Sequence, residues 1–332
     1  MKSRLRTPVE REDIAPSRIQ HLKNASSDFN AAGANDMTNQ PMGSSTVIEF
    51  PDDIDWANLA LPDTWPDQLN FKNPLSLVRL LTHLLRKRQQ VKLPRGLPGA
   101  ETIPPYALQE FHHLPNGNYS HALTRGYLAG FDISMLGHMP RVRQRLAEHL
   151  THCHAVLDLG CGGGATAAAI QAKGVADVWG LDPSPYVLRY AAQDYPQVHF
   201  AQGVMEKLPF PNQRFDGMSA CFVFHEVPPF YVRQALAETA RVLTPGGLLV
   251  IAEPSPIQLR DSFLSMIKQY GWQGGYFQLL ASLVYEPFVR AWHRFALTDE
   301  AAEQDLLVLE EDDGMPVKYW LLQRGPLRAK PL

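Results

Sequence analysis

From Ala155 the sequence alternates short apolar runs with segments of helix length, and this alternation limits the possible folds more than any other feature. The apolar runs are residues 155–159, 177–181, 198–201, 215–221 and 248–252, and the helix-length segments are 165–173, 184–194 and 230–243. Strands joined by crossover helices form a parallel sheet that is covered on both faces. We therefore predict an α/β fold with a doubly wound, mostly parallel sheet.

The C-terminal part of the sequence has a different pattern. Apolar runs at 305–309 and 317–322 flank Asp313-Gly314, a dipeptide that is typical of tight hairpin turns. Two strands joined by such a turn run antiparallel. The sequence therefore predicts a seven-stranded sheet that ends in an antiparallel C-terminal hairpin.

The N-terminal part contains few regular apolar patterns. Residues 1–50 are polar and have too little apolar surface to offset the entropy of ordering, so we expect a disordered tail. Residues 51–105 are expected to form a helical and irregular extension that ends in a proline-rich linker at 94–105. Residues 106–332 are expected to form the main domain, with its core at 153–323.

Residues 74–95 combine a leucine-rich stretch with cations and contain no acid. Pro74 suits the first turn of a helix over 75–88, and the cations suit its C-terminal end. The cations are Arg79, Arg86, Lys87, Arg88, Lys92 and Arg95. A basic amphipathic helix packs on its own protein, lies on a membrane surface or binds an acidic partner. We expect packing on the main domain, and peripheral membrane contact through residues 74–95 is the alternative.

The overall composition sets limits on partners and compartment. The formal net charge of -3 provides no general attraction to nucleic acid, and no nucleic-acid partner is expected. Cys153, Cys161 and Cys221 lack both the close spacing of a zinc site and the number that a disulfide framework needs, which predicts no metal site and a reducing compartment. The sequence has neither the pattern of a secretory signal nor an apolar run of the roughly 18 residues that span a bilayer. We expect a cytoplasmic protein.

A glycine-rich loop at 160–164 follows the first apolar run. Such a loop between a strand and a helix turns sharply, and it lies at the carboxyl ends of the strands, where open α/β sheets bind ligands. Gly160, Gly162 and Ala165 also satisfy the G-x-G-x-x-G/A pattern of dinucleotide-binding proteins, and Asp182 follows about 20 residues later. Taken alone, the loop therefore leaves a dinucleotide open.

Asp158 argues against a dinucleotide. It lies inside the strand, two residues before Gly160, where an acid suits the cationic S-adenosylmethionine and suits a pyrophosphate poorly. In addition, the segment 241–247 introduces the fifth strand, and the sheet ends in the Asp-Gly hairpin rather than in a second βαβαβ half. We therefore predict S-adenosyl-L-methionine as the cofactor.

With these features, the sequence resembles the class I, Rossmann-like S-adenosylmethionine-dependent methyltransferases of the small-molecule type (types 11 and 25). The matching blocks are 156–164, 180–184, 206–210, 215–216 and 238–247, in the order and spacing of that family. The resemblance implies methyl transfer to a small organic acceptor by in-line displacement. The alternatives are a cofactor-binding protein that serves as a scaffold or partner, and a methyltransferase that acts on protein or RNA.

The resemblance also implies which residues bind the cofactor. Asp158 and the glycine loop are expected to hold the methionine end, and Asp182 is expected to accept hydrogen bonds from the ribose hydroxyls. Val204 stands where many relatives carry an acid, so we expect the Met205 backbone to help hold the adenine. The full predicted set is Asp158, Gly160, Cys161, Gly162, Asp182, Pro183, Met205, Glu206, Cys221 and Phe222.

The candidates for catalysis and acceptor binding come from two regions. His225, in the block 221–229 after the fourth strand, is the predicted general base if the acceptor arrives protonated, and a backbone-bonded loop histidine is the alternative. Glu226 is expected to brace His225 or a helix start. The segments before the first strand are expected to form a lid. The predicted acceptor-site residues are Tyr119, Tyr127, Phe131, Tyr285 and His293.

Overall fold

The computed structural model describes residues 54–70, 72–84 and 90–326. The predicted disordered tail, residues 1–50, lies outside these ranges, as does the cationic end of the helix predicted over 75–88. Within the described residues this helix is α1, Pro74–Leu84.

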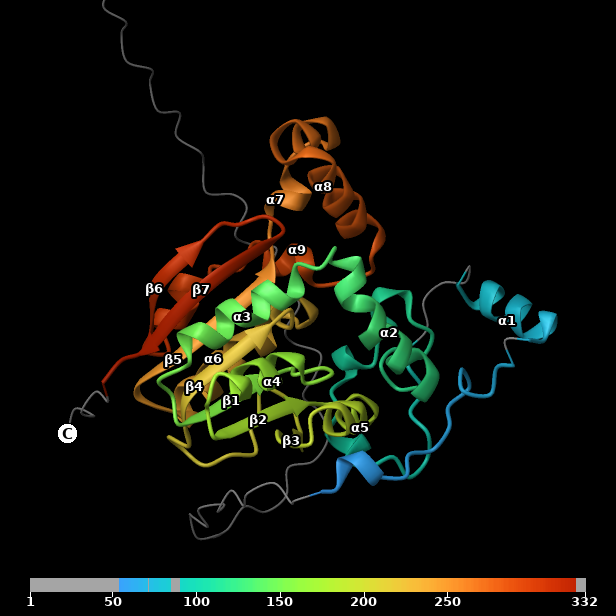
Figure 1. Ribbon diagram of the computed structural model, residues 1–332, viewed down its shortest axis with the longest axis horizontal. Helices are drawn as coiled ribbons and strands as arrows, with labels where there is room; N and C mark the ends of the chain where they lie inside the picture. Colours follow the sequence, from blue (N-terminus) through green and yellow to red (C-terminus); the bar gives the residue numbers. More distant parts are fainter. Residues whose placement is uncertain (1–53, 71, 85–89, 327–332) are drawn as a thin grey trace, which may run out of the picture. The chain divides into compact units, whose positions relative to one another are not determined.

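Seven strands form one sheet with the order β3-β2-β1-β4-β5-β7-β6 (Figure 1). The strands are β1 Ala155–Leu159, β2 Asp177–Asp182, β3 His199–Gln202, β4 Phe215–Cys221, β5 Leu243–Pro254, β6 Leu306–Asp312 and β7 Val317–Arg324. The first five strands pair in parallel, whereas β7 is antiparallel to both β5 and β6. The predicted doubly wound sheet with an antiparallel C-terminal hairpin is confirmed.

Helices cover both faces of this sheet. Those around the sheet core are α3 Met139–His149, α4 Ala165–Ala172, α5 Pro185–Asp194, α6 Pro229–Val242 and α10 Leu297–Ala302. The buried side chains of α3, α4 and α5 pack on one face, and those of α6 and α10 pack on the other. The other elements are α2 His121–Ser134, α7 Ile257–Arg260, α8 Phe263–Leu283 and α9 Val289–Trp292, with short 3-10 helices at Trp56–Asn58, Ala100–Thr102, Pro105–Ala107, Phe111–His113 and Phe224–Glu226 (η5).

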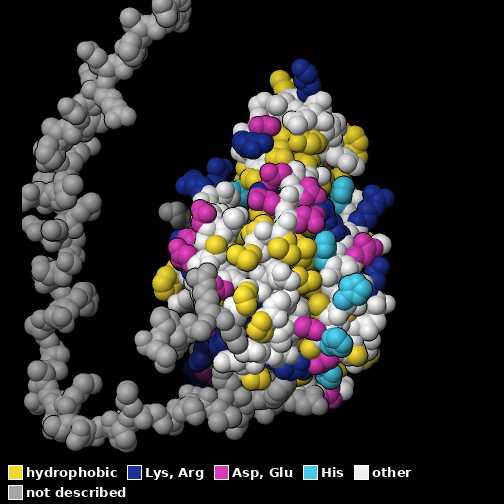
Figure 2. All heavy atoms as spheres, turned by 90° about the vertical axis from the view of Figure 1, so that its left-hand side faces the viewer, with side chains coloured by type: hydrophobic (Ala, Val, Ile, Leu, Met, Phe, Trp, Pro, Cys, Tyr) yellow, Lys and Arg dark blue, Asp and Glu magenta, His cyan; other side chains and the backbone are white. Residues whose placement is uncertain are grey.

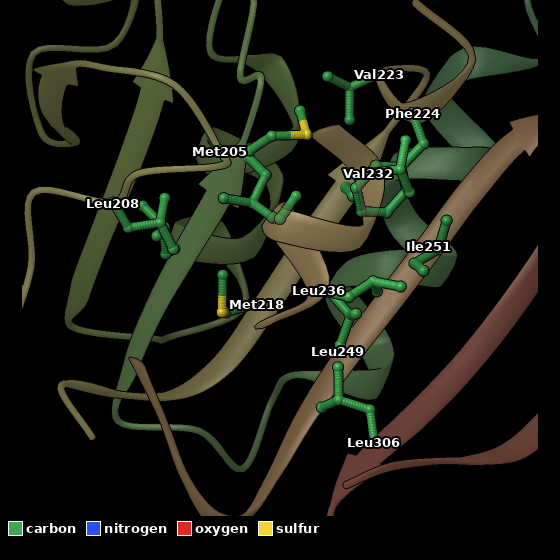
Figure 3. Close-up of a cluster of buried hydrophobic side chains, with 14 of the residues drawn as sticks. Met205, Leu208, Met218, Val223, Phe224, Val232, Leu236, Leu249, Ile251 and Leu306 are labelled. Carbon is green, nitrogen blue, oxygen red and sulfur yellow. The ribbon is translucent and has the colours of Figure 1, made fainter. Parts of the chain in front are cut away.

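The core on the α6 face extends to the loop that follows β4. Leu236 of α6 belongs to the same buried cluster as Leu249 and Ile251 of β5, and the cluster continues to Val223 and Phe224 (Figure 3). Phe224 is fully buried. Core packing therefore fixes the start of the segment that carries His225.

Strand β5 begins before the apolar run 248–252 from which it was predicted. The strand begins at Leu243, which pairs with Phe215, and the register then shifts so that Gly217 pairs with Leu248. Gly246 has a φ of 81°, a left-handed conformation that glycine adopts without strain. Residues 244–247 therefore form an irregularity inside β5, because a bulge can absorb extra residues without ending the strand pairing.

The structure contains a helical hairpin that the sequence analysis does not predict. The two halves of α8 meet at Gly271, where φ is 66° and ψ is −162°. A Cβ atom on Gly275 would lie 2.8 Å from Cγ1 of Ile267, and one on Gly274 would meet the carbonyl oxygen of Met266. Residues eight apart cannot touch along a straight helix, so the two halves fold back on each other.

The segment predicted as a linker at 94–105 is packed against the domain. Leu97 and Ile103 are buried in a cluster with Tyr186 of α5, and the Gln202 side chain donates a hydrogen bond of 3.0 Å to the carbonyl oxygen of Pro98.

The helices of the described residues were also compared with the requirements for crossing a membrane. Across the described ranges, none of them is both long enough and apolar enough to do so.

Candidate functional site

A cavity of about 670 Å³ lies at the carboxyl ends of the parallel strands. One side is formed by the glycine loop after β1 and by the ends of β2 and β4. The opposite side comes from residues 106–143, which include α2, and from residues 254–293, which include α8. Both outer segments lie outside the sheet core, as expected for a lid over a ligand site.

The glycine loop meets the cavity through its backbone. Gly160 and Gly162 have φ values of 57° and 51°, in the left-handed region that favours glycine. A Cβ atom on Gly160 would overlap the Val223 side chain, whereas one on Gly162 would find no atom within 4 Å. Gly160 therefore permits close packing, and Gly162 leaves its backbone accessible from the cavity.

Asp182 ends β2 and is tied to the glycine loop. Its Oδ2 atom accepts a hydrogen bond of 3.2 Å from the Gly162 amide, and its Oδ1 atom accepts one of 2.9 Å from the Ser184 amide. Burial raises the pKa of Asp182 to about 6, although the two amides counteract part of this shift. Each carboxylate oxygen retains a lone pair, so the group can still accept hydrogen bonds from a ligand.

Asp158 lies behind the glycine loop and is not among the residues that line the cavity, so its role at the methionine end, directly or through water, stays a prediction. It is 1% exposed, and its Oδ1 atom accepts a hydrogen bond of 2.6 Å from the Ser219 hydroxyl. Its Oδ2 atom is buried without a hydrogen-bond partner. Burial raises the pKa of Asp158 to about 7, more than the Ser219 hydrogen bond lowers it. A buried polar atom without a partner is uncommon and marks a place where water or a ligand donor would be stabilising.

Phe222 follows β4 in a strained conformation. Its φ is 58°, although it is not glycine, and its amide donates a hydrogen bond of 2.8 Å to the carbonyl oxygen of Ala252. Its ring lies edge-on to Phe131 of α2, with 5.8 Å between the ring centroids. Such backbone strain is found preferentially at functional sites. Here it turns an aromatic side chain from the end of a strand toward the lid.

His225 lies in η5 between two carboxylates. Its Nδ1 atom is 2.6 Å from Oε2 of Glu253, and its Nε2 atom is 3.5 Å from Oε1 of Glu286. Burial alone would lower the pKa of His225, but Glu286 and Glu253 outweigh it and hold this pKa well above its ordinary value. The ring is therefore an imidazolium at neutral pH. A general base must be unprotonated, and two facing carboxylates favour the protonated ring, so the base role of His225 stays a prediction that this arrangement disfavours.

Glu253 organises the whole η5 segment. Its carboxylate accepts hydrogen bonds from the backbone amides of Val223, Phe224 and His225 at 2.9, 2.7 and 3.4 Å, in addition to the ring contact. The side chain is completely buried at the end of β5. The sequence analysis missed Glu253. An available signal was its position directly after the apolar run 248–252, because the ends of parallel strands meet at one edge of the sheet.

A second histidine, His112, comes from the segment before β1. Its Nε2 atom is 2.7 Å from Oε1 of Glu226, and its Nδ1 atom is 3.8 Å from Oε1 of Glu286. The Tyr127 ring stacks on it with 5.1 Å between centroids. Of the two predicted roles of Glu226, bracing His225 is not what the structure has, because Glu226 faces His112 and Glu253 holds His225; bracing a helix start stays a prediction. Burial would raise the pKa of Glu286, but His225 and His112 lower it below its ordinary value.

The cavity brings together most of the residues predicted from the sequence. Those that line it are Gly160, Cys161, Gly162, Asp182, Pro183, Met205, Cys221, Phe222, His225, Tyr119, Tyr127, Phe131 and His293. Asp158, Glu206 and Tyr285 are not among the lining residues. The Glu206 carboxylate accepts a hydrogen bond of 2.8 Å from the Tyr106 hydroxyl, and the Tyr285 hydroxyl donates one of 3.1 Å to the Gln109 side chain.

One part of the cavity wall is apolar. Its side chains come mainly from α2 and α8, two helices that the sequence analysis does not identify. They include Leu128, Phe131, Met135, Phe277, Leu280 and Ala281. The cavity therefore has a polar end at His225 and Glu286 and an apolar wall from α2 and α8.

Comparison with known proteins gives the family. Residues 156–247 match the family described as a methyltransferase domain. The demethylmenaquinone methyltransferase of Bacillus licheniformis is 30% identical over 169 residues, which are 48% of this chain and 69% of that protein. This chain belongs to the class I S-adenosylmethionine-dependent methyltransferases. An uncharacterized methyltransferase of Synechocystis sp. is 38% identical to this methyltransferase over 98 residues, 30% of this chain and 46% of that protein.

Two further relatives and one solved structure match this methyltransferase over part of its length. It spans 40% of the length of the demethylmenaquinone methyltransferases of Chlorobaculum parvum and Chlorobaculum tepidum. The solved structure of the PH0226 protein from Pyrococcus horikoshii OT3 is 18% identical with a TM-score of 0.43, and the match covers 57% of this chain and 91% of that one.

Proposed function

We propose that this methyltransferase binds S-adenosylmethionine beside the glycine loop and Asp182 and methylates a small organic acceptor held next to His225 and Glu286. The observation that carries the proposal is that one cavity of about 670 Å³ includes both places. Small-molecule sites commonly have volumes of about 300–1,000 Å³. The two ligands would therefore meet within a single cavity.

The residues present fit the cofactor. Gly162 offers backbone without a side chain in the way, and Asp182 offers lone pairs for hydroxyl groups. The unpartnered Oδ2 atom of Asp158 lies behind the same loop, and a cation bound beside the loop would stabilise the ionised form of this carboxyl group. When bound, S-adenosylmethionine supplies a methyl group on a sulfonium that is already an activated leaving group.

The walls of the cavity favour a small acceptor over RNA or a folded protein. Residues from α2 and α8 close the side opposite the sheet. Walls on both sides limit the water around the reacting atoms and help to hold them in line, which are the two requirements of a methyl displacement. The alternative that the protein serves only as a scaffold receives no support from the site. A hydrogen bond joins Gly162 of the glycine loop to Asp182, which holds the two parts of a cofactor site together.

The polar end of the cavity can take a proton from the acceptor. The attacking oxygen or nitrogen atom becomes much more acidic as its bond to the methyl group forms, so a carboxylate is a sufficient base. Glu286 lines the cavity and can accept a hydrogen bond from an O–H or N–H group. His225, held by Glu253, positions Glu286 from the buried side. We therefore assign proton acceptance to Glu286 and a positioning role to His225.

Two measurements test this function in sequence. Calorimetric titration with S-adenosylmethionine should show micromolar binding, and NADH, as the control ligand, should not bind. A labelled-methyl assay on cell extract, separated into organic-soluble, water-soluble, protein and nucleic-acid fractions, should then place the label in a small-molecule fraction. Label in protein or nucleic acid would contradict the proposed acceptor class. Cofactor binding without label in any fraction would support the scaffold alternative.

A further inference from the structure

The α8 hairpin exposes an unusual amount of apolar surface. Thirteen large apolar side chains are exposed in the part of the chain that the structure describes, and six of them lie on this one element. They are Phe263, Leu264, Ile267, Trp272, Leu279 and Leu283. Leu264 and Trp272, close to the turn at Gly271, are 77% and 66% exposed. Exposed apolar residues concentrated on one element mark an interaction surface.

The exposed charges that the segment 256–296 itself contributes to this surface have one sign. Residues 256–296 are described without a gap, and every charged side chain classed as exposed there is a cation. These cations are Arg260, Lys268, Arg290 and Arg294. The two acids of the segment are partly buried: Asp261 lies 3.7 Å from Arg260, and Glu286 faces His225 inside the cavity. This cationic excess contrasts with the net charge of -3 for the whole chain.

The same hairpin also forms part of the cavity wall. Phe277, Leu280 and Ala281 line the cavity, whereas their neighbours Leu279 and Leu283 face outward. The top of the molecule in Figure 2, on the side of α7 and α8, shows hydrophobic side chains next to lysine and arginine, with acidic side chains further toward the sheet. Apolar surface therefore continues from the outside of α8 to the inside of the site.

We propose that the α8 hairpin docks on an anionic lipid bilayer. An element with large apolar side chains, an exposed tryptophan and flanking cations has the composition of segments that lie in the membrane interface. A second copy of the chain would be a poorer occupant, because a two-fold interface at this surface would bring the same four cations toward one another. Docking here would place the apolar wall of the cavity next to the acyl chains.

Vesicle co-sedimentation of the full chain tests the proposal. The probes are vesicles of phosphatidylcholine with one quarter phosphatidylglycerol, and vesicles of phosphatidylcholine alone. The wild-type chain should bind the anionic vesicles, and the double variant Leu264→Gln/Trp272→Gln should lose at least tenfold in affinity. The matched control is Leu307→Gln/Leu309→Gln, which removes two exposed leucines from β6 and should change binding less than twofold. A charge variant, Lys268→Gln/Arg290→Gln, should reduce binding to the anionic vesicles toward the level seen with phosphatidylcholine.

Three outcomes would overturn docking on a bilayer. The first is that the wild-type chain sediments neither with the anionic vesicles nor with the phosphatidylcholine vesicles. The same result is expected if another segment of the chain covers α8. The second is equal loss in the α8 variant and the β6 control. The third is a dimer in sedimentation velocity that the α8 variant converts to a monomer. Calorimetry with S-adenosylmethionine on every variant measures cofactor binding independently of vesicle binding, so failure of docking is distinguishable from failure of the proposed methyl transfer.

Discussion

The Nδ1 atom of His225 lies 2.6 Å from the Oε2 atom of Glu253, and the two side chains are 2% and 0% exposed. The same carboxylate accepts hydrogen bonds from the amides of Val223 and Phe224. Glu253, a buried acid at the end of β5, therefore fixes both the backbone conformation after β4 and the orientation of the His225 ring.

Replacing Glu253 should be costly for stability. In Glu253→Gln the amide NH₂ group would face groups that are themselves donors, and the His225 ring would lose its buried partner. Breaking a buried ion pair costs about 3–5 kcal/mol, and we expect a loss in this range in the free energy of unfolding measured with urea at pH 7. Glu286→Gln, at the cavity surface, is the comparison and should cost about 1 kcal/mol or less while abolishing most methyl transfer. Equal costs for both variants would contradict the assigned roles.

The raised pKa of His225 predicts a specific pH dependence of stability. The folded-state pKa of His225 lies above its unfolded-state value of about 6.5. The contribution of His225 to the free energy of unfolding is therefore fully present below the unfolded-state pKa. It is lost as the pH rises through the folded-state pKa. The difference in unfolding free energy between the wild type and His225→Gln should therefore shrink as the pH rises above neutrality. A difference that grew with pH would show that the ring is neutral in the folded protein.

Cofactor affinity should depend on the ionisation of Asp182. Its pKa of about 6 means that the carboxylate is charged at pH 8 and largely protonated at pH 5. Calorimetry should show weaker binding of S-adenosylmethionine below about pH 6, and Asp182→Asn should bind about tenfold or more weakly at pH 8. Asp177→Asn, at the opposite end of β2, is the control and should leave the affinity unchanged.

Filling the apolar wall should separate acceptor binding from cofactor binding. Ala281 of α8 lines the cavity, away from the glycine loop in sequence and in fold. In Ala281→Trp the added ring would occupy acceptor space, so turnover should fall at least tenfold while calorimetric affinity for S-adenosylmethionine stays within about twofold. Ala296→Trp, at an exposed position, should alter neither quantity. Loss of cofactor affinity in Ala281→Trp would place the cofactor, rather than the acceptor, at α8.

The close packing of the α8 hairpin should make one glycine substitution destabilising. A Cβ atom at Gly274 would meet the Met266 carbonyl oxygen, so Gly274→Ala should cost about 1–3 kcal/mol and accelerate hydrogen exchange in α8. Gly126 of α2 is exposed and has no atom within 4 Å of a Cβ position. Gly126→Ala should therefore stabilise the protein by about 0.5–1 kcal/mol, because alanine favours the helix.

The sequence by itself determined the sheet and one side of the site. Each strand from β1 to β5 is a local apolar run, and the C-terminal hairpin follows from Asp313-Gly314, so neighbouring residues alone carry these features. The glycine loop and Asp182 were predictable for the same reason. Parallel strands bring their carboxyl ends to one edge, which places these two motifs together.

The tertiary structure alone decided the other side of the site. His225 and Glu253 are 28 residues apart in sequence, and His112 and Glu226 are 114 apart, so no local pattern links either pair. The α8 hairpin has apolar residues on both its inner and outer surfaces, and it therefore lacks the single apolar stripe that identifies a helix from sequence. Whether Asp158 faces a ligand or lies behind the loop, and whether His225 is neutral or charged, depends on which distant groups surround each side chain. Those neighbours are defined only when the chain folds.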